Sequence, residues 1–272
     1  MLLNALSQSA LGRPQTLHVH SAFEHAINLI DERGHILSLV TRDKPLIPAG
    51  AKIDTDAFPE VSVTDKVLFW GEGIAIKGGK TALVINLGNA PEMDLDVHES
   101  VTDTGPLKEA LSRFVSIHTN EHLTYRWEDE AGAHERVGVP LLTLQSWQDE
   151  RFADIHRGDI AIATIGLLGL GPGLTPSGDD FICGWLWAWH ITADTRLAAL
   201  CSAIKEQAGG TTDISRNFLY HACHGRFVEC LHVAMSNPQR GFAWLSEQGF
   251  SSGMDTLAGA HFGLRAHDLS LA

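Results

Sequence analysis

Charged side chains are distributed very unevenly along this chain, and that asymmetry limits the folds available to it. Residues 1–157 carry 37 Asp, Glu, Lys and Arg side chains, whereas residues 158–272 carry only 16. A chain of 272 residues forms one large domain or two modest ones, since a domain typically holds roughly 100–200 residues. The change in charge density therefore predicts two domains, residues 1–150 and residues 151–272, of which the second is unusually apolar.

The first of these domains has the pattern of strands and turns. Residues 26–30 and 35–40 are β-prone runs on either side of a turn that contains Gly34. A second hairpin is predicted for residues 67–76 and 81–87, because the Gly-Gly pair between them supplies the positive φ that tight hairpin turns require. We therefore expect a mostly antiparallel β domain, and leave open whether its strands close into a barrel.

Helical periodicity appears once in the first domain and dominates the second. Apolar residues recur at helical spacing just after Pro106, at Leu107, Ala110, Leu111, Phe114 and Val115. Four further helices are predicted after the boundary, over residues 181–193, 196–208, 214–235 and 252–266. The expected fold class is α+β: a mostly antiparallel β domain with one helix, followed by a mostly α-helical C-terminal domain.

Composition excludes several classes of function. The chain has 20 Lys and Arg against 33 Asp and Glu, a net charge of −13, which argues against nucleic-acid and anionic-membrane binding. Its four cysteines form no C-x-x-C pair, so we interpret them as free thiols of a reducing compartment. The N-terminus lacks a signal-peptide pattern, and the uncharged run 160–178 is interrupted by Pro172 and Pro176. A cytoplasmic protein is expected.

The most informative stretch, residues 169–181, reads GLGPGLTPSGDDF. Its glycines give the backbone the freedom that a tight loop or a close ligand contact requires: Gly169, Gly171 and Gly173. Thr175 and Pro176 resemble a cap and first-turn pair, and Ser177 and Asp180 have capping-box spacing. The amides and dipole of such a helix start predict an anion site, although the motif is neither a Walker A loop nor G-x-G-x-x-G.

Two other segments of the second domain begin in a similar way. Residues 252–259 repeat the pattern of residues 177–184, with serine, glycine, aspartate and a final glycine at matching places, and residues 209–215 are a third polar helix start. We predict that the three starts share one site. Its catalytic candidates are Asp179, Asp180 and Asp255; its substrate-binding candidates are Gly171, Gly173, Thr175, Ser177, Gly178, Thr211, Thr212, Ser215, Ser252, Gly253 and Thr256.

Simpler interpretations stand beside this one. Ser, Thr and Asp at helix starts are good caps by themselves, and Gly184 and Gly259 are also suited to close helix packing. The carboxylates would repel an anion, so they would instead hold ligand N–H groups, act as a general base or bind a cation. His221, His224 and His232 would share one face of a continuous helix, but span too far for one metal. No metal and no cofactor are predicted, and the three tryptophans of residues 181–193 are expected to lie in a core or interface.

The motif G-P-G-L-T-P-S-x-D-D at residues 171–180 resembles the family that contains AllH, a subunit of bacterial oxamate carbamoyltransferase. The resemblance continues through Thr211-Thr212-x-x-Ser215 and residues 231–233 into residues 252–257, and touches residues 26–29. It implies an enzyme of three subunits, with FdrA-type (AllF-like) and AllG-like partners. The reaction it implies converts oxalurate and phosphate to oxamate and carbamoyl phosphate in purine and allantoin nitrogen catabolism.

This implied activity fits the predicted site. Oxalurate, oxamate, carbamoyl phosphate and phosphate are small anions that helix starts could hold, and the aspartates suit ureido N–H groups. Amides of the 171–178 loop could stabilise an oxyanion, and direct transfer by positioning is the preferred mechanism. Two alternatives remain: a non-catalytic assembly subunit, suggested by the apolar helix 181–193, and a metal-dependent amide hydrolase using His221, His224 and an aspartate.

Overall fold

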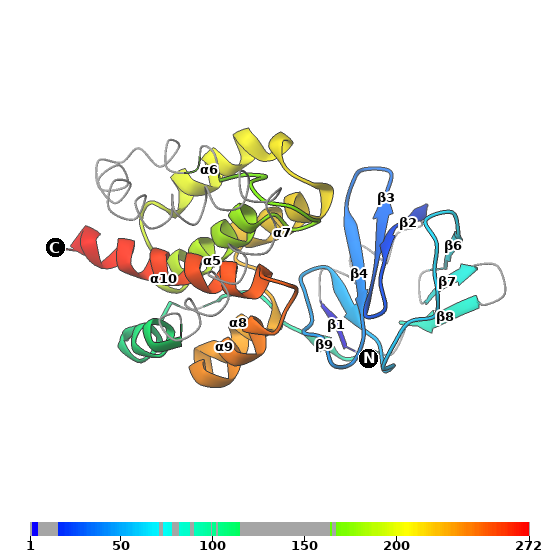
Figure 1. Cartoon of the computed structure of the whole chain (residues 1–272), viewed down its shortest axis with the longest axis horizontal. Coiled ribbons are helices and arrows are strands. Elements are labelled where there is room, and N and C mark those ends of the chain that lie inside the picture. The colour runs from blue at the N-terminus through cyan, green and yellow to red at the C-terminus, as the bar shows by residue number, and fades with distance from the viewer. Residues whose placement is uncertain are drawn as a thin grey trace, which may run out of the picture. The chain divides into compact units, whose positions relative to one another are not determined.

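The computed structural model describes residues 2–4, 16–70, 73–77, 82–87, 90–98, 100–101, 103–114, 164 and 167–271. The chain divides into two compact units, one of Met1–Leu95 with Phe227–Glu229 and one of Asp96–Arg226 with Cys230–Ala272. Strands make up the first unit and helices the second (Figure 1), so the predicted α+β class is confirmed. The boundary predicted between residues 150 and 151 lies outside the described residues.

The first unit is built on one mixed, mostly antiparallel sheet. Its nine described strands lie in the order β8-β7-β6-β2-β3-β4-β5-β1-β9, and only β4–β5 and β1–β9 pair in parallel among them. The end strands β8 and β9 do not pair with each other in the described part of the chain, so the sheet is a half-barrel. The strands are β1 (Leu2–Asn4), β2 (Leu17–Ala22), β3 (Ala26–Asp31), β4 (Ile36–Val40), β5 (Gly50–Lys52), β6 (Lys66–Phe69), β7 (Gly73–Lys77), β8 (Ala82–Asn86) and β9 (Glu92–Met93).

The first predicted hairpin is confirmed. Strands β3 and β4 pair antiparallel, and the Asp31 carboxylate accepts the amides of Arg33 and His35 at 2.8 Å each. Gly34 has φ of 85°, which a residue with a side chain rarely adopts. The turn is therefore encoded locally, by one carboxylate and one glycine.

The second predicted hairpin is partly wrong, because residues 67–76 are not one strand. They form the antiparallel strands β6 and β7, and the amide of Trp70 donates to the carbonyl of Gly73 where the chain reverses. A Cβ on Gly73 would lie 2.1 Å from the Trp70 ring, so the glycine lets the chain turn back against the indole. Strands β7 and β8 pair as predicted, but their turn at residues 78–81 lies outside the described residues.

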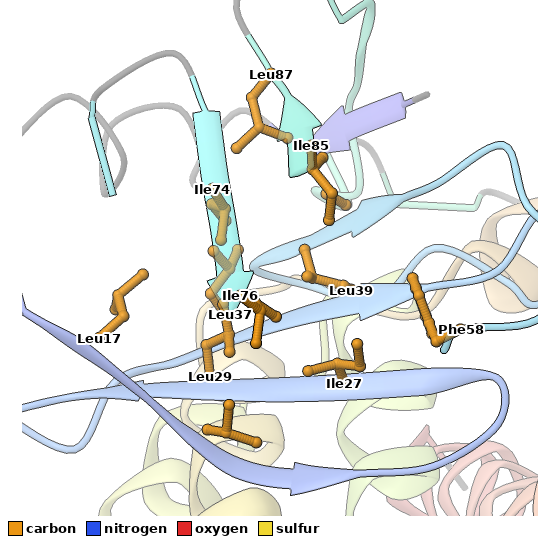
Figure 2. Close-up of a cluster of buried hydrophobic side chains, with 12 residues drawn as sticks. Leu17, Ile27, Leu29, Leu37, Leu39, Phe58, Ile74, Ile76, Ile85 and Leu87 are labelled. Atoms are coloured by element: carbon orange, nitrogen blue, oxygen red, sulfur yellow. The ribbon is translucent and has the colours of Figure 1, made fainter. Parts of the chain in front are cut away.

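Alternating apolar residues of these strands form the core of the first unit (Figure 2). Ile27, Leu29 and Leu39 are fully buried in it. The intervening position on β3, Asn28, faces the other way, and its Oδ1 accepts a hydrogen bond of 2.6 Å from Ser38. Because successive side chains of a strand point to opposite faces, apolar residues at every second position bury this segment as a strand and not as a helix.

Phe227–Glu229 adds an ion pair to the first unit. The Glu229 carboxylate lies 2.6 Å from Lys52 Nζ and also accepts the amide of Leu46 at 2.8 Å. Only 13% of each charged side chain is exposed. Both charges are therefore compensated inside the unit rather than by water.

The second unit is helical. Residues 105–114 form a helix whose Leu107 and Leu111 are buried, as predicted, while Val115 lies outside the described residues. None of the helices in the described ranges is long and apolar enough to cross a membrane. The labelled helices are α5 (Ser177–Ile191), α6 (Leu197–Gln207), the 3-10 turn η2 (Ala208–Gly210), α7 (Asp213–Cys223), α8 (Glu229–Ser236), α9 (Pro238–Ser246) and α10 (Ser252–Leu271).

The single helix predicted over residues 214–235 is wrong. Helix α7 ends at Cys223, the following cap is His224, and α8 begins only at Glu229. Gly225 has φ of 79°, which ends helical geometry.

The residues after the predicted stop at Asn237 form α9, in which Asn237 caps the amide of Arg240 and Pro238 occupies the first turn. Sequence reasoning treated this proline as an end and missed the helix that it begins.

Helices α5 and α10 pack along each other in the same direction. A Cβ on Gly184 would lie 1.9 Å from the carbonyl oxygen of Thr256, and a Cβ on Gly259 would lie 1.8 Å from that of Phe181. The packing interpretation of these two glycines is confirmed. The tryptophans of α5 fill the surrounding core with no exposed surface, which confirms the core over the interface interpretation: Trp185, Trp187 and Trp189.

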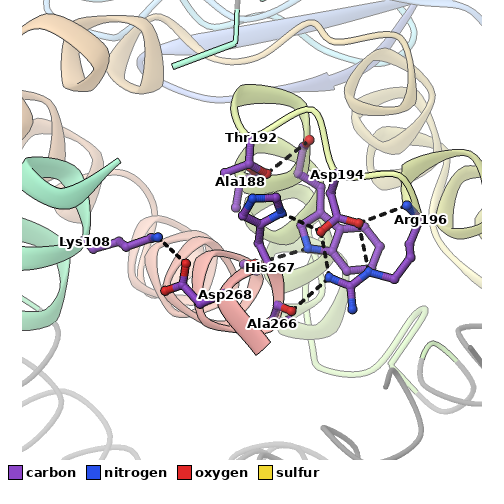
Figure 3. A network of polar contacts seen from close by, with 10 residues as sticks. Lys108, Ala188, Thr192, Asp194, Arg196, Ala266, His267 and Asp268 are labelled. Carbon is purple, nitrogen blue, oxygen red and sulfur yellow. Dashed lines mark hydrogen bonds and ion pairs between the residues drawn. The ribbon is translucent and has the colours of Figure 1, made fainter. Parts of the chain in front are cut away.

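The far ends of these two helices are tied by a polar network (Figure 3). Asp194, just after α5, accepts bonds of 2.8 and 2.6 Å from the Arg196 guanidinium and one of 2.8 Å from His267 Nδ1 on α10. Arg196 also donates to the carbonyl of Ala266 and stacks on Trp189, 4.7 Å from its ring centre. This network was not predicted, because it joins Asp194 and Arg196 to Ala266 and His267, which lie 70 or more residues further along the chain.

Candidate functional site

The starts of α5 and α10 meet through their side chains. Thr175 Oγ1, before α5, lies 2.8 Å from Ser252 Oγ, the first residue of α10. Asp180, in the first turn of α5, lies close enough to both hydroxyls for them to favour the charged form of its carboxylate. The structure therefore brings three predicted site residues, Thr175, Asp180 and Ser252, together at the starts of the two helices.

Asp255 adds a second carboxylate to this group. Its side chain is buried, with 5% exposed, and in the described part of the chain the buried Oδ2 atom of Asp180 has no hydrogen-bond partner. Burial, followed by the charge of Asp255, raises the pKa of Asp180 well above its usual value, although the nearby hydroxyls of Ser252 and Thr175 favour the charged form. A buried carboxyl pair of this kind favours retention of a proton, because two like charges would otherwise repel in a poorly solvated place.

The pairing of Asp180 with Asp255 follows the sequence repeat. These residues hold equivalent places in Ser177–Gly184 and Ser252–Gly259, as do Phe181 and Thr256. Gly184 approaches Thr256 and, reciprocally, Gly259 approaches Phe181. The two helix starts are thus related by a local two-fold pseudosymmetry, and the carboxylates face each other across it.

Asp179 points to a different helix start. Its carboxylate accepts the hydroxyl of Thr211, which precedes α7, and the amide of Gly169 at 2.9 Å. Only 1% of the residue is exposed; burial raises its pKa, although bonds from Thr211, Gly169 and Ser215 favour the charged form. Asp179 therefore holds the glycine-rich loop and the α7 start against α5, and all three predicted starts do lie together.

The glycine-rich loop needs its glycines. Gly169, Gly171 and Gly173 have φ of 74°, 123° and 91°, in the region that side chains disfavour. A Cβ on Gly173 would have no atom within 4 Å, so this part of the loop is open. By contrast, the amide of Gly178 already donates to the carbonyl of Leu170 at 2.9 Å, which removes one of the amides expected to bind an anion.

The predicted capping box of α5 is wrong. The cap of α5 is Pro176, and no side chain caps the helix. Ser177 is buried, and the Asp180 carboxyl lies among Asp255, Ser252 and Thr175 instead of capping the backbone at its own helix start. Tertiary neighbours have displaced the local pattern that the spacing suggested.

Several other predicted site residues have structural roles in capping, hydrogen bonding or close packing. Thr212 caps α7 by accepting the Ser215 amide at 3.1 Å, and its hydroxyl donates to the carbonyl of Leu174 at 2.5 Å. Thr256 donates to the Ser252 carbonyl of its own helix. Glycines 178 and 253 permit close backbone contacts, since an added Cβ would lie 1.9 and 1.8 Å from the carbonyls of Leu167 and Leu245 respectively.

The basic residues and histidines lie with other partners. Arg216 pairs with Asp213 at 2.8 Å and Arg226 with Asp96 at 3.2 Å. His221 is buried, whereas His224 donates to the Tyr220 carbonyl. The break after α7 also removes His232 from their helix. In the part of the chain that the structure describes, no group of three or more His, Cys, Asp or Glu side chains is placed to hold a metal ion.

Sequence reasoning missed one contact of the site and one neighbour of its carboxyls. The Leu174 carbonyl accepts the hydroxyls of Thr212 and Ser215, which fixes the loop against α7. Cys183 lies one turn along α5, where burial and the charges of Asp180 and Asp179 raise the pKa of its thiol. The three-residue spacing from Asp180 to Cys183 on one helix face could have revealed this neighbour, whereas a backbone carbonyl has no signature in the sequence.

The chain matches two family models. Residues 1–92 match the AllH family N-terminal domain, and residues 167–264 match oxamate carbamoyltransferase subunit AllH. The second match contains the starts of α5, α7 and α10, and the two together cover more than half of the chain. No solved structure gives a significant match.

Proposed function

Because this chain belongs to the AllH family of oxamate carbamoyltransferase subunits, we propose that the paired carboxyls of Asp180 and Asp255 bind the carbamoyl-transfer substrate. The observation that carries the proposal is the meeting of the α5 and α10 starts, where Thr175 and Ser252 hydrogen-bond to each other beside the buried carboxyls of Asp180 and Asp255. A carboxyl pair that retains one proton both accepts and donates hydrogen bonds. It suits a ureido or amide group, which offers N–H donors beside a carbonyl acceptor.

The substrates are those of the family's reaction, oxalurate with phosphate or, in reverse, oxamate with carbamoyl phosphate. An oxygen of hydrogen phosphate attacks the carbamoyl carbon, and a C–O bond forms as the C–N bond breaks. In this proposal the protonated carboxyl of the Asp180–Asp255 pair gives its proton to the leaving oxamate nitrogen, and the proton of the hydrogen phosphate replaces it on the pair. Asp179 acts as a positioning residue, through Thr211 and Gly169.

The anionic ends of the substrates belong in the open part of the glycine-rich loop. Gly173 leaves room there for close approach, since an added Cβ would meet no atom within 4 Å, whereas Gly171 packs against Ser177, whose amide nitrogen would lie 2.8 Å from its added Cβ. The dipoles of α5, α7 and α10 favour negative charge at their starts. Remaining first-turn amides, with the Ser177 and Ser252 hydroxyls, complete this part of the proposed site. Transfer then proceeds by positioning, without a covalent enzyme intermediate.

The assembled enzyme tests the proposal. In a complex with its partner subunits, Asp180→Asn and Asp255→Asn should each lower kcat/KM by about 10- to 100-fold, the effect of losing a charge-assisted hydrogen bond of roughly 1.5–3 kcal/mol. Asp268→Asn is the matched control, because Asp268 lies on α10 with half of its side chain exposed. Unchanged kcat/KM in both variants, with complex formation intact, would reject the assignment.

A subunit implies partners, and we propose that they are FdrA-type (AllF-like) and AllG-like proteins in the cytoplasm.

The alternative of a non-catalytic assembly subunit loses the observation that suggested it, because the three tryptophans of α5 are buried in the chain's own core. Calorimetry of the isolated chain with oxamate, oxalurate and carbamoyl phosphate separates the two. Binding of any of them by the lone subunit counts against a purely architectural role.

A further inference from the structure

Three of the four cysteines lie near one another in the helical unit and are not fully buried. Cys183 is on α5, Cys201 is on α6, and Cys223 is the last residue of α7. The fourth, Cys230 on α8, is buried. All four are free thiols, and the proposed site uses none of them.

Cys201 and Cys223 are in direct contact. Cys201 Sγ donates to the backbone carbonyl of Cys223 at 3.6 Å, which places the two cysteines next to each other. The pair joins α6 to the C-terminal end of α7. From a contact this close, side-chain rotation can bring the two sulfurs to the S–S length of about 2.05 Å.

The contact makes the two sulfurs chemically different. The hydrogen bond from Cys223 lowers the pKa of the Cys201 thiol, and Lys205, one turn further along α6, adds a favourable charge that offsets partial burial. The same hydrogen bond, followed by burial, raises the pKa of Cys223. Cys201 is therefore the better nucleophile, because the thiolate is the reactive form.

We propose that Cys201 and Cys223 form a reversible dithiol–disulfide couple that responds to low-molecular-weight disulfides of the glutathione type. The Cys201 thiolate attacks one sulfur of the small disulfide, forms a mixed disulfide and releases one thiolate. Cys223 then loses its proton to solvent and attacks Cys201 Sγ, forming the internal disulfide and releasing the second thiolate. Two protein thiols are oxidised and one small disulfide is reduced to two thiols, so atoms and electrons balance.

The second step is easier than the raised pKa of Cys223 in the fully reduced protein suggests. Once Cys201 carries a mixed disulfide it can no longer be negatively charged, so the interactions with Cys201 that hold the proton on Cys223 disappear. Cys183 is the competing partner, but burial and the charges of Asp180 and Asp179 raise the pKa of its thiol. It is therefore the slower nucleophile.

The full-length protein tests the couple. Reduced protein is incubated with oxidised glutathione, the remaining thiols are alkylated, and intact mass and peptide maps are recorded. The expected result is loss of two alkylatable thiols, a cross-link between the peptides of Cys201 and Cys223, and full reversal by dithiothreitol. Four thiols left alkylatable, or a cross-link to Cys183, would overturn the proposal.

Single variants separate the two steps. Cys223→Ser should trap glutathione on Cys201, Cys201→Ser should prevent the loss of two thiols, and Cys230→Ser should behave as the wild type. Alkylation of Cys201 should also slow at neutral pH in Cys223→Ser, with its pH profile shifted upward. Trapping on another cysteine, or an unchanged pH profile, would contradict the assigned roles.

Discussion

Asp179 and Asp180 are consecutive residues of α5, yet their carboxylates lie at two different helix starts. Asp179 accepts the hydroxyl of Thr211 before α7, and Asp180 lies close to Asp255 and Ser252 at the start of α10. Successive side chains of a helix point about 100° apart, so one dipeptide can hold two neighbours. The Asp-Asp pair thereby gathers the three helix starts around α5.

Replacement of Asp180 by Asn should raise thermal stability even though it lowers activity. The pKa of Asp180 is raised in the folded state. Its carboxyl therefore lowers the free energy of unfolding increasingly as pH rises above the usual pKa of 3.8, and the loss reaches its full size above the raised pKa. Asp180→Asn should therefore melt roughly 2–4 °C above the wild type at pH 8, the shift that about 1 kcal/mol produces, and the gap should narrow in acid. Thermal melting across pH measures it. Asp54→Asn, with 78% of its side chain exposed, should not reproduce the pH-dependent gap.

Adding one methyl group between α5 and α10 should be costly. Gly184→Ala or Gly259→Ala places a Cβ within 2 Å of a backbone carbonyl, which no side-chain rotation relieves. We expect a loss of about 1–3 kcal/mol or more in the free energy of unfolding, measured by urea denaturation. Gly209→Ala is the matched control, because no atom lies within 4 Å of its added Cβ; a similar loss there would refute the explanation.

Removal of the Asp194 carboxylate should destabilise the helical unit. Its side chain is 1% exposed and that of Arg196 is 16% exposed, so Asp194→Ala leaves a poorly solvated guanidinium and should cost about 3–5 kcal/mol. Burial alone would raise the pKa of Asp194, but hydrogen bonds from Arg196 and His267 outweigh it and lower the pKa. The stability difference between wild type and variant should thus be constant above the usual value of 3.8 and shrink as pH falls through the lowered pKa. A difference that instead grows in acid contradicts this account.

The Glu229 ion pair should matter more than an exposed one. Glu229→Gln removes the charge that serves Lys52 and weakens acceptance of the Leu46 amide, at an expected cost of about 1–3 kcal/mol by thermal or urea unfolding. Glu109→Gln is the control, since Glu109 pairs with Arg113 where 66% and 75% of the side chains are exposed. Such a surface pair contributes under about 1 kcal/mol. Equal effects of the two substitutions would argue against compensation inside the unit.

Features encoded by neighbouring residues could be predicted from the sequence. The β3–β4 hairpin follows from Asp31 and Gly34 within a few residues of each other, and α5 from a continuous apolar run. The meeting of the helix starts was predicted from the repeat of Ser177–Gly184 in Ser252–Gly259, and the hydrogen bond between Thr175 and Ser252 confirms it. The roles of these residues toward a substrate stay predictions.

Features decided by distant partners could not be predicted. The capping box failed because Asp180 is buried beside Asp255 and Ser252, which lie more than 70 residues away in the sequence. The break after Cys223 depends on the left-handed conformation of Gly225, and a lone glycine in an otherwise helical pattern does not reveal such a conformation. The strand reversal at Trp70 likewise depends on packing of its ring against Gly73.

The glycine contacts of α5 and α10 also distinguish how the three helix starts are attached. Gly184 and Gly259 set the spacing of α5 and α10 by backbone contact, so that spacing lasts as long as the two helices stay packed. The start of α7, in contrast, is tied to α5 through the Thr211 hydroxyl and the Asp179 carboxylate. Its attachment therefore depends on a side-chain hydrogen bond that a single substitution can remove, whereas that of α5 to α10 does not.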